Sequence, residues 1–270
     1  MKLPLDPCGV RVYDLSQPLE QATPTSPNHP GFQIALMRRH GDVVRADGSS
    51  GANDLMTLGT HTGTHIDALC HIANRGILHG GADAATALRG GRFAELGAET
   101  IAPIVARGVL LDVGGQLTPD GVLDPGKRID RPELEEACRR AGVEPRAGDV
   151  VLVRTGWTRH LADPEAFLGR RTGVPGVDES GARWLAGRRV RAVGADTMSF
   201  EHIVPGPNPL LPVHTILLVE HGIHIIEMLN LDELAQDGVA EFLLIAAPLR
   251  IVGATGAPIR PLGIVNVHAR

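Results

Sequence analysis

The chain has 270 residues, of which 43% are hydrophobic and 21% charged, and its formal net charge at pH 7 is -5. This composition supports a sizeable core and excludes a disordered chain, and the scattered arginines argue against nucleic acid as a partner. Cys8, Cys70 and Cys138 are too few for a disulfide framework, and no apolar run reaches the roughly 18 residues of a membrane span, so we expect a cytoplasmic protein without membrane contact.

The N-terminal half is expected to contain short extended segments joined by loops. Val10 to Leu15 predicts a short strand, a proline-rich loop follows through Pro30, and Phe32 to Met37 is a second apolar stretch. Residues 76–91 are rich in glycine and predict a loop, whereas Gly108 to Val113 predicts a buried strand.

Residues 59–71 read Gly-Thr-His-Thr-Gly-Thr-His-Ile-Asp-Ala-Leu-Cys-His. The nitrogen of imidazole and the oxygen of carboxylate are donors that zinc and similar divalent ions prefer, so the density of these groups predicts a metal site. Cys70 lies within the cluster, but its even position opposes the face on which the odd-numbered residues lie. For Cys70 we therefore expect packing rather than thiolate ligation.

The spacing within this cluster indicates how its side chains converge. A single strand would separate His61 from His71 by about 33 Å. A single helix would turn Asp67 away from His61 and His65. We therefore expect a bend at Gly63, an extended stretch that aims His65 and Asp67 the same way, and a helical turn that returns His71.

Helical and extended patterns alternate in the second half of the chain. Asp130 is expected to cap a helix whose apolar positions follow one face and which ends at Gly142. The expected helices are 130–141, 178–186 and 213–221, the expected strands are 149–154, 190–195, 223–228 and 241–246, and the C-terminal remainder is expected to be irregular. Such alternation predicts an α/β domain with a parallel or mixed sheet, and we treat residues 1–270 as a single domain.

The last helix and strand of this series contain five ionisable side chains among aliphatic residues: His214, Glu220, His221, His224 and Glu227. Glu220, His221 and His224 fit an ordinary solvated surface. His214 begins a helix, and Glu227 lies in an aliphatic strand, where a carboxylate is costly to bury unless it is paired or metal-bound. For His214 and Glu227, a structural role and metal ligation both stay open.

Four more polar side chains follow the strand at 190–195: Asp196, Ser199, Glu201 and His202. They have two open interpretations, because residues in such loops either orient substrate and metal ligands or form structural hydrogen bonds. The sequence contains no Gly-x-Ser-x-Gly elbow, which argues against a serine hydrolase.

The pattern His61-x-Gly63-Thr64-His65-x-Asp67-x-x-x-His71, with His214 and Glu227 further on, resembles the cyclase-like metal-dependent hydrolases, a family that includes bacterial kynurenine formamidases and isatin hydrolases. Further similar segments span nearly the whole chain: Tyr13 to Ser16, Arg107 to Asp112, Gly148 to Trp157, Gly194 to Asp196 and Ile226 to Leu231. The resemblance implies a fold similar to the swivelling β/β/α domain and assembly as a homodimer or homotetramer.

The resemblance also implies five metal ligands: His61, His65, Asp67, His214 and Glu227. Asp67 would bridge to a second metal that His214 also binds, and Glu227 would contact both ions. His71 would be the catalytic acid/base. The implied cofactor is one or two divalent ions, with Zn²⁺ expected first and Mn²⁺ as the alternative.

The implied reaction is hydrolysis of an amide-like C–N bond in a small molecule, either an N-formyl arylamine such as N-formylkynurenine or a cyclic amide. Lactone hydrolysis, a metal-dependent lyase or cyclase reaction through an enolate, and ligand binding without catalysis stay open as alternatives. Compared with compact kynurenine formamidases, the chain has Leu69 in place of a proline, and Tyr13 matches their aromatic lid position only loosely. Insertions at 41–53 and 162–177 are expected to reshape the pocket.

Overall fold

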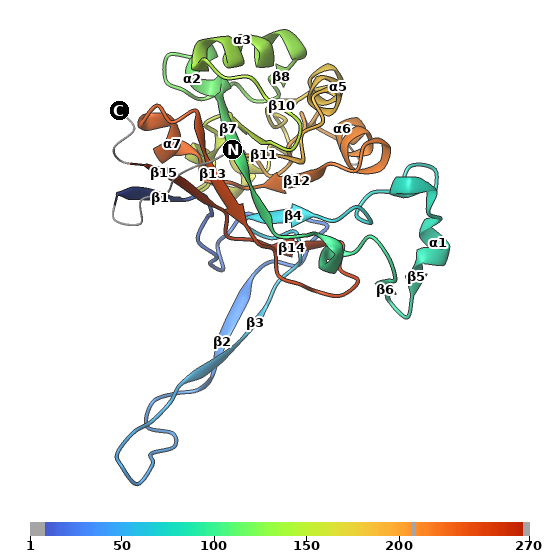
Figure 1. Cartoon of the computed structure of the whole chain (residues 1–270). Coiled ribbons are helices and arrows are strands. Elements are labelled where there is room, and N and C mark those ends of the chain that lie inside the picture. Colours follow the sequence, from blue (N-terminus) through green and yellow to red (C-terminus); the bar gives the residue numbers. More distant parts are fainter. Residues whose placement is uncertain (1–8, 207–208, 267–270) are drawn as a thin grey trace.

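Residues 9–206 and 209–266, which the computed structural model describes, form a nine-stranded sheet flanked by short helices (Figure 1). Its strands are β1 (Val10–Asp14), β4 (His65–Asp67), β7 (Ile104–Asp112), β9 (Val150–Arg154), β11 (Ala192–Ala195), β12 (His224–Glu227), β13 (Glu241–Ala246), β14 (Gly256–Pro258) and β15 (Leu262–Asn266). They are ordered β1-β15-β13-β7-β9-β11-β12-β4-β14. The four central strands from β7 to β12 run parallel and the outer pairs antiparallel, which confirms the predicted α/β class with a mixed sheet.

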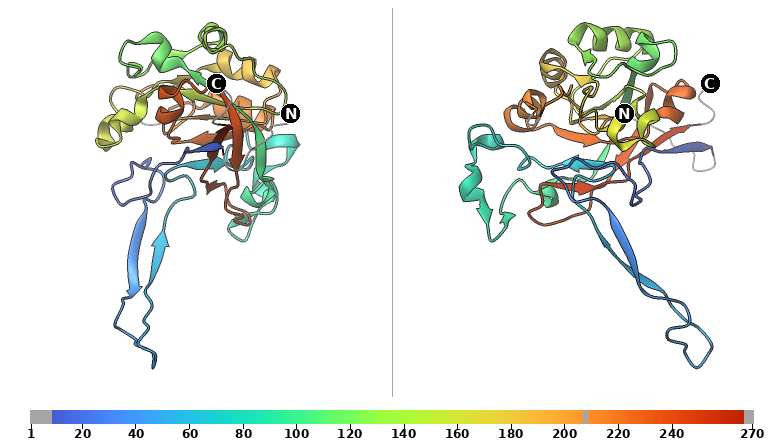
Figure 2. Two further views of the ribbon diagram at one scale, coloured as in Figure 1. Left: turned by 60° about the vertical axis from the view of Figure 1, so that its left-hand side comes forward. Right: turned by 180° about the vertical axis from the view of Figure 1, so that it is seen from behind.

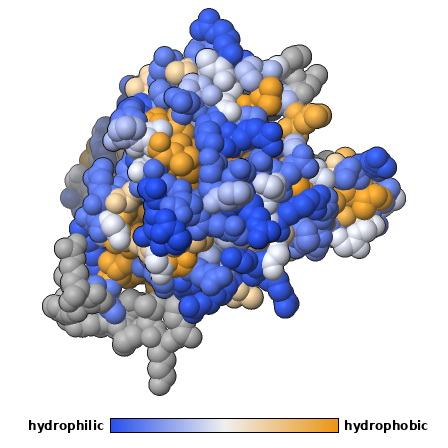
Figure 3. Space-filling view, turned by 90° about the horizontal axis from the view of Figure 1, so that it is seen from above, coloured by the Kyte–Doolittle hydropathy of each residue, from blue (hydrophilic) through white to orange (hydrophobic). Residues whose placement is uncertain are grey.

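Helices cover one face of the sheet, at the top of Figure 1: α2 (Val113–Leu117), α3 (Arg131–Ala141), α5 (Glu179–Gly187) and α6 (Pro212–His214), which continues as a π-helical segment over Thr215–Glu220. The outer surface of this face is predominantly hydrophilic (Figure 3). The predicted start and end of α3 are confirmed. The carboxylate of Asp130 accepts from Glu133 N at 3.0 Å, Glu133 Oε2 accepts from Asp130 N at 3.1 Å, and Gly142 ends the helix with a φ of 65°.

Short elements lie in the connections: η1 (His79–Gly81), α1 (Ala84–Ala87), β5 (Leu88–Arg89), β6 (Arg92–Phe93), η2 (Ala98–Thr100), β8 (Arg128–Ile129), η3 (Trp157–His160), α4 (Pro164–Phe167), β10 (Gly176–Val177) and α7 (Asp232–Gln236). The segment 76–91, for which a loop was expected, contains η1, α1 and β5 between turns. No helix in the described residues has both the length and the apolar composition of a membrane span.

The core lies on both faces of the central strands, because successive side chains of a strand point in opposite directions. Val151 of β9 packs in the cluster under the helices, together with Leu134 of α3 and Leu185 of α5. The next residue, Leu152, belongs to a second cluster that includes Phe242 of β13. Burial on both faces explains why the central strands are nearly continuous apolar runs.

The C-terminal region corrects one expectation. β13 has the predicted bounds, but the described residues after it include two strands, β14 and β15, between irregular segments. β15 pairs with both β1 and β13, and β14 is an edge strand beside β4. Pro258 ends β14, and an edge position tolerates a residue without a backbone N–H.

A hairpin formed by β2 (Gln33–Arg38) and β3 (Asn53–Thr57) projects away from the sheet, as Figure 2 shows from two further directions. All residues of both strands are exposed. The insertion at 41–53 forms the far end of this hairpin.

Candidate metal centre and cavity

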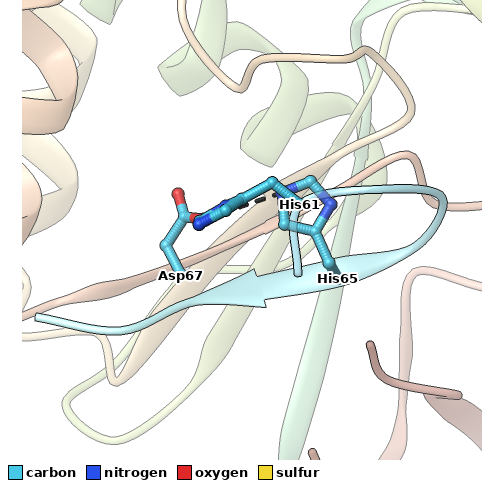
Figure 4. A group of neighbouring side chains, drawn as sticks. All are labelled: His61, His65 and Asp67. Carbon is cyan, nitrogen blue, oxygen red and sulfur yellow. Dashed lines mark ion pairs between the residues drawn. The ribbon is translucent and has the colours of Figure 1, made fainter. Parts of the chain in front are cut away.

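The first group of predicted ligands lies on β4 and the turn before it. Gly63 has a φ of +67°, and a Cβ atom there would lie 2.3 Å from Leu19 Cδ2. This left-handed residue produces the expected bend, after which β4 directs His65 and Asp67 toward the same side. Figure 4 shows their side chains beside that of His61.

Asp67 is the central residue of this group. Its Oδ1 lies 2.8 Å from His61 Nδ1 and 3.6 Å from His65 Nε2, and all three side chains are buried. His65 Nδ1 donates to the backbone oxygen of Gly63 at 2.8 Å, so Nε2 is the ring nitrogen directed at the carboxylates. His61 Nε2 hydrogen-bonds Thr255 Oγ1 at 2.9 Å, which directs Nδ1 toward Asp67.

The second group joins Asp67 to His214 and Glu227. His214 Nε2 lies 3.7 Å from Asp67 Oδ2 and 3.3 Å from Glu227 Oε1, while Glu227 Oε2 lies 3.3 Å from His65 Nε2. Each group of three ligand atoms fits within 4.8 Å. The two oxygens of Asp67 therefore face different groups, and the two oxygens of Glu227 span them.

The donor set fits divalent ions. His65 Nε2 and both carboxylate oxygens of Asp67 are buried without a hydrogen-bond partner, which is costly unless a cation satisfies them. Burial and the charge of Asp67 raise the pKa of Glu227, but the imidazoles of His214 and His65 beside it outweigh them and lower it to about 2. Burial raises the pKa of Asp67, but the charges of the histidines around it, that of His71 foremost, lower it overall. Both carboxylates are thus ionised at neutral pH and able to bind a cation.

Glu201 and His224 form hydrogen bonds with two of the proposed ligands. His214 Nδ1 donates to Glu201 Oε1 at 2.6 Å, and the same carboxylate accepts from the backbone N of His214 at 2.9 Å. Of the two open interpretations for Glu201, the structure therefore favours orientation of a predicted ligand. His224 Nδ1 donates to the backbone oxygen of Asp67 at 2.8 Å, so its interpretation as ordinary surface was wrong. Burial lowers the pKa of His224.

The other residues of the loop after β11 have different surroundings. Asp196 is buried and accepts from Thr155 N, Thr155 Oγ1 and Gly156 N, so its contacts are structural. Ser199 lines the cavity beside the metal centre, whereas His202 does not. Tyr13 donates its hydroxyl to Asp237 Oδ2 at 2.7 Å and does not line that cavity either.

The remaining predicted surface and packing residues agree with their interpretations. Glu220 pairs with Arg183 at 2.9 Å, and His221 is exposed. Cys70 is buried and directs its thiol to Ala254 O at 3.6 Å, and burial raises its pKa to about 11. Cys70 therefore packs as a small apolar residue, whereas Cys8 lies outside the described residues.

His71 lines the cavity beside the two ligand groups. A turn in which His71 N donates to Ala68 O at 2.9 Å returns it to the cluster, as expected, and its ring stacks on His61 with a centroid separation of 4.0 Å. Burial lowers the pKa of His71 to about 3, with the charges of His61 and His214 acting in the same direction and that of Asp67 opposing them. In the absence of an ion, His71 is thus a neutral imidazole able to accept a proton.

His29 is a cavity residue that the sequence did not reveal. Its ring lies 5.0 Å from that of His61 and 6.5 Å from that of His71. Burial, followed by the charges of His61 and His65, lowers its pKa. A histidine in a proline-rich loop, far from the motif in sequence, gives no periodic signal.

A cavity of about 380 Å³ opens beside the two ligand groups. Its wall includes Ser26 to His29, Leu168 to Arg170 and Met198, together with His71. The insertion at 162–177 thus shapes the cavity as expected. The insertion at 41–53 does not line it, because that segment lies at the far end of the hairpin.

Comparisons with known proteins agree on one family. The family model described as "Putative cyclase" matches residues 13–202. Isatin hydrolase of Roseibium aggregatum is 28% identical over 232 residues, covering 82% of this chain and 77% of that protein. Kynurenine formamidase of Geobacillus thermodenitrificans is 28% identical over 250 residues, covering 92% of this chain and 94% of that protein.

Solved structures extend this similarity to the fold. A crystal structure described as a novel cyclase superposes with a TM-score of 0.84 and 29% identity, covering 94% of this chain and 88% of that one. Isatin hydrolase A from Ralstonia solanacearum gives a TM-score of 0.73 and 28% identity, covering 95% of this chain and 92% of that one. A predicted metal-dependent hydrolase from Bacillus stearothermophilus gives a TM-score of 0.61 and 25% identity, covering 94% of this chain and 98% of that one.

Proposed function

Because the chain belongs to the cyclase family of metal-dependent hydrolases, we propose that it hydrolyses an amide-like C–N bond of a small molecule, with His71 as the acid/base. The substrate would be an N-formyl arylamine, such as N-formylkynurenine, or a cyclic amide. The N-formyl amide corresponds to the relative named kynurenine formamidase, and the cyclic amide to the relative named isatin hydrolase.

The observation that carries this proposal is the position of His71 at the cavity beside two sets of buried ligand atoms. His65 Nε2 and the Asp67 carboxylate have no hydrogen-bond partner in the described structure, although both are buried. The proposed ligands are His61, His65 and Asp67 for one ion, and Asp67, His214 and Glu227 for a second. Zn²⁺ is the preferred candidate and Mn²⁺ the alternative.

A divalent ion bound at these residues would supply a Lewis acid for the carbonyl and would lower the pKa of a bound water from about 15.7 toward 7. The protein itself orients the ligands. Glu201 fixes the ring of His214, and the backbone oxygen of Gly63 fixes that of His65. Such supporting contacts determine which imidazole nitrogen is available to the site.

His71 moves the proton in the proposed reaction. As water adds its oxygen to the carbonyl carbon, a ring nitrogen of His71 takes the released proton. When the C–N bond breaks, His71 returns that proton to the leaving nitrogen, so an acid and an amine are formed and His71 is again neutral. A positioned acid/base of this kind contributes roughly 10²–10⁴-fold in rate.

Hydrolysis in ¹⁸O-labelled water tests the reaction class. Protein loaded with Zn²⁺ or with Mn²⁺ is incubated with N-formylkynurenine, isatin, a cyclic imide and a small lactone, and the products are analysed by mass spectrometry. We expect one solvent oxygen in the acid product of an amide-like substrate. Turnover of the lactone alone would favour the lactonase alternative, and product formed without solvent oxygen would favour a lyase or cyclase.

A further inference from the structure

A cavity of about 550 Å³, which we call the second cavity, lies apart from the one beside the metal centre. Its wall includes Arg189, Arg191, Ile223 and His224, and it shares no residue with the wall that contains His71. No aspartate or glutamate is among the described residues that line it. Pockets of roughly 300–1,000 Å³ commonly bind small molecules, so the second cavity has the size of a ligand site.

The two arginines give the second cavity a positive charge that no carboxylate in its wall balances. Neither arginine forms an ion pair within residues 9–206 and 209–266. Asp149, whose backbone oxygen accepts from Arg191 N at 2.8 Å, directs its carboxylate to Arg107 Nη1 at 2.6 Å instead. Glu220 likewise pairs with Arg183 at 2.9 Å. The whole chain has a net charge of -5, so this local positive charge does not follow from a general excess of basic residues. An anion is therefore the class of ligand that fits.

Backbone contacts position Arg191 but leave part of its guanidinium group available. Its Nη2 donates to the backbone oxygens of Ala102 at 3.2 Å and Pro103 at 3.3 Å. A guanidinium group has five N–H donors, so the others can bind a ligand. Arg189 has a φ of 59°, a left-handed conformation that glycine adopts at a lower cost, so the backbone does not explain an arginine there. Guanidinium groups bind carboxylate and phosphate oxygens through paired hydrogen bonds, which is the chemistry that two arginines offer here.

His224 connects the second cavity to the metal centre. It begins β12, beside Ala192 of the parallel strand β11, and Glu227 ends the same strand about 10 Å away. Its Nδ1 donates to the backbone oxygen of Asp67 at 2.8 Å. Asp67 belongs to both groups of proposed ligands. A molecule that contacts the ring of His224 therefore acts on the backbone of a proposed metal ligand.

We propose that the second cavity binds a small molecule with a carboxylate or phosphate group, held by Arg189 and Arg191, and that this molecule increases the affinity of the metal centre. The bound molecule holds the ring of His224 in place, and the hydrogen bond from His224 then fixes the backbone at Asp67. Metal ligands that are fixed in advance bind an ion at a smaller entropic cost. The binding of the anion is independent of the proposed function, whereas its effect rests on the metal centre of that function.

Calorimetric titration of the Zn²⁺-loaded protein with succinate, inorganic phosphate and uncharged succinamide tests the binding. We expect at least one of the two anions to bind and succinamide not to bind. Binding of succinate alone would identify the carboxylate as the recognised group, and binding of phosphate alone the phosphate. Arg189→Gln with Arg191→Gln should weaken the binding at least about 10-fold, since hydrogen bonds to charged groups are the stronger ones. The matched control, Arg38→Gln with Arg39→Gln, removes the same charge from two exposed arginines outside the second cavity and should bind the anion like the wild type.

The single variant Arg189→Gln provides the same test if the double variant does not fold, because the side chain of Arg189 is exposed. Failure of both anions to bind would refute the site. Equal binding of succinamide, or an equal loss of binding in the Arg38→Gln and Arg39→Gln control, would refute recognition by the two arginines of the second cavity.

Competition with a metal-chelating dye tests the effect on the metal centre. With the anion bound, the affinity for Zn²⁺ should rise about 5-fold, and by linkage the affinity for the anion should rise by the same factor when Zn²⁺ is bound. The arginine variant in the same buffer corrects for anion that binds Zn²⁺ in solution. His224→Phe keeps a ring but cannot donate to Asp67 O, so it should bind the anion and lose the effect. Unchanged metal affinity, or an effect that persists in His224→Phe, would refute the connection. A protein that binds the anion but no Zn²⁺ would overturn the proposed metal centre and leave the anion site standing.

Discussion

At the scale of single residues, the candidate site depends on the division of Asp67 between two neighbouring groups. Its Oδ1 faces His61 and its Oδ2 faces His214, and neither oxygen has a hydrogen-bond partner in the described structure. A buried carboxylate whose oxygens accept no hydrogen bond is costly, so a bound cation would stabilise it. Glu227 adds a second negative charge that the histidines stabilise. The same atoms thus explain both the burial of the carboxylates and the proposed affinity for metal.

His71 should affect turnover rather than metal binding. We predict that His71→Ala retains the wild-type metal content but lowers kcat about 10²–10⁴-fold, since the substitution removes the proposed proton carrier and none of the proposed ligands. Steady-state kinetics together with elemental analysis measures both quantities. His221→Ala, which changes an exposed histidine outside the cavity, is the control and should leave kcat unaltered. Equal kcat for wild type and His71→Ala would reject the role of His71.

Removal of the metal should make the fold sensitive to acid through His71. Burial lowers its pKa from 6.5 to about 3 in the folded metal-free chain, so the unfolded chain binds this proton more readily. The part of the free energy of unfolding that depends on a neutral His71 is fully present above pH 6.5 and is lost as the pH falls toward about 3. Urea unfolding of the metal-free protein measures this between pH 6.5 and about pH 3. As the pH falls, the free energy of unfolding should decrease less for His71→Gln than for the wild type. Parallel declines would show that His71 is not the group responsible.

At the scale of secondary structure elements, one glycine determines how β4 presents its side chains. Gly63 has a φ of +67°, and the expected bend, strand and turn around it are all present. The strand pairs with β12, where Glu227 lies opposite His65. The bend thus places residues that are distant in sequence within reach of one another.

Replacing this glycine should weaken the metal site. In Gly63→Ala the new Cβ would lie 2.3 Å from Leu19 Cδ2, and the left-handed backbone would cost roughly 1–2 kcal/mol. Gly41→Ala is the matched control, because Gly41 also has a positive φ, of +93°, but no atom within 4 Å of its added Cβ. Both variants should lose stability in urea unfolding, and only Gly63→Ala should also lose affinity in a competition with a metal-chelating dye. Equal metal affinity of the two variants would show that the bend is not needed.

Local signals predicted the two longest α-helices, α3 and α5, and all four parallel strands of the sheet. Asp130 and Gly142 determine the ends of α3 through side-chain and backbone hydrogen bonds within a few residues, so the sequence was sufficient there. β15 was missed because its partners, β1 and β13, include the strand at the opposite end of the chain, and such pairing has no local pattern. The direction of the hairpin was missed for a related reason, because an apolar stretch does not show which surface it will contact.

The residues of the candidate site likewise include some that the sequence predicted and others that only the folded structure reveals. The spacing of residues 61–71 and the family resemblance predicted six side chains that the structure brings together at the two ligand groups and the cavity. Glu201, His224 and His29 join them only through tertiary contacts, as in the hydrogen bond from His214 to Glu201. Polar residues of this kind in loops are common, so their roles needed the folded structure.

At the scale of the whole molecule, the fold is that of the cyclase family. A solved structure described as a novel cyclase shares the fold across 94% of this chain, at a TM-score of 0.84. The ligand groups lie on the strands and turns of the sheet, whereas the cavity wall consists of loops and the segment at 162–177. Differences in substrate among relatives with this fold are therefore expected to arise from the loops.

If Asp67 is shared by two metal sites, as we propose, the number of ions bound per chain depends on its carboxylate. Elemental analysis of metal-free protein reloaded with Zn²⁺ and desalted should give about two ions per chain for the wild type and about one for His214→Ala, which removes a ligand of one group only. Asp67→Ala should bind less than one, because both groups lose a ligand. An Asp67→Ala protein that retains as much metal as the wild type would show that the two sites do not share Asp67.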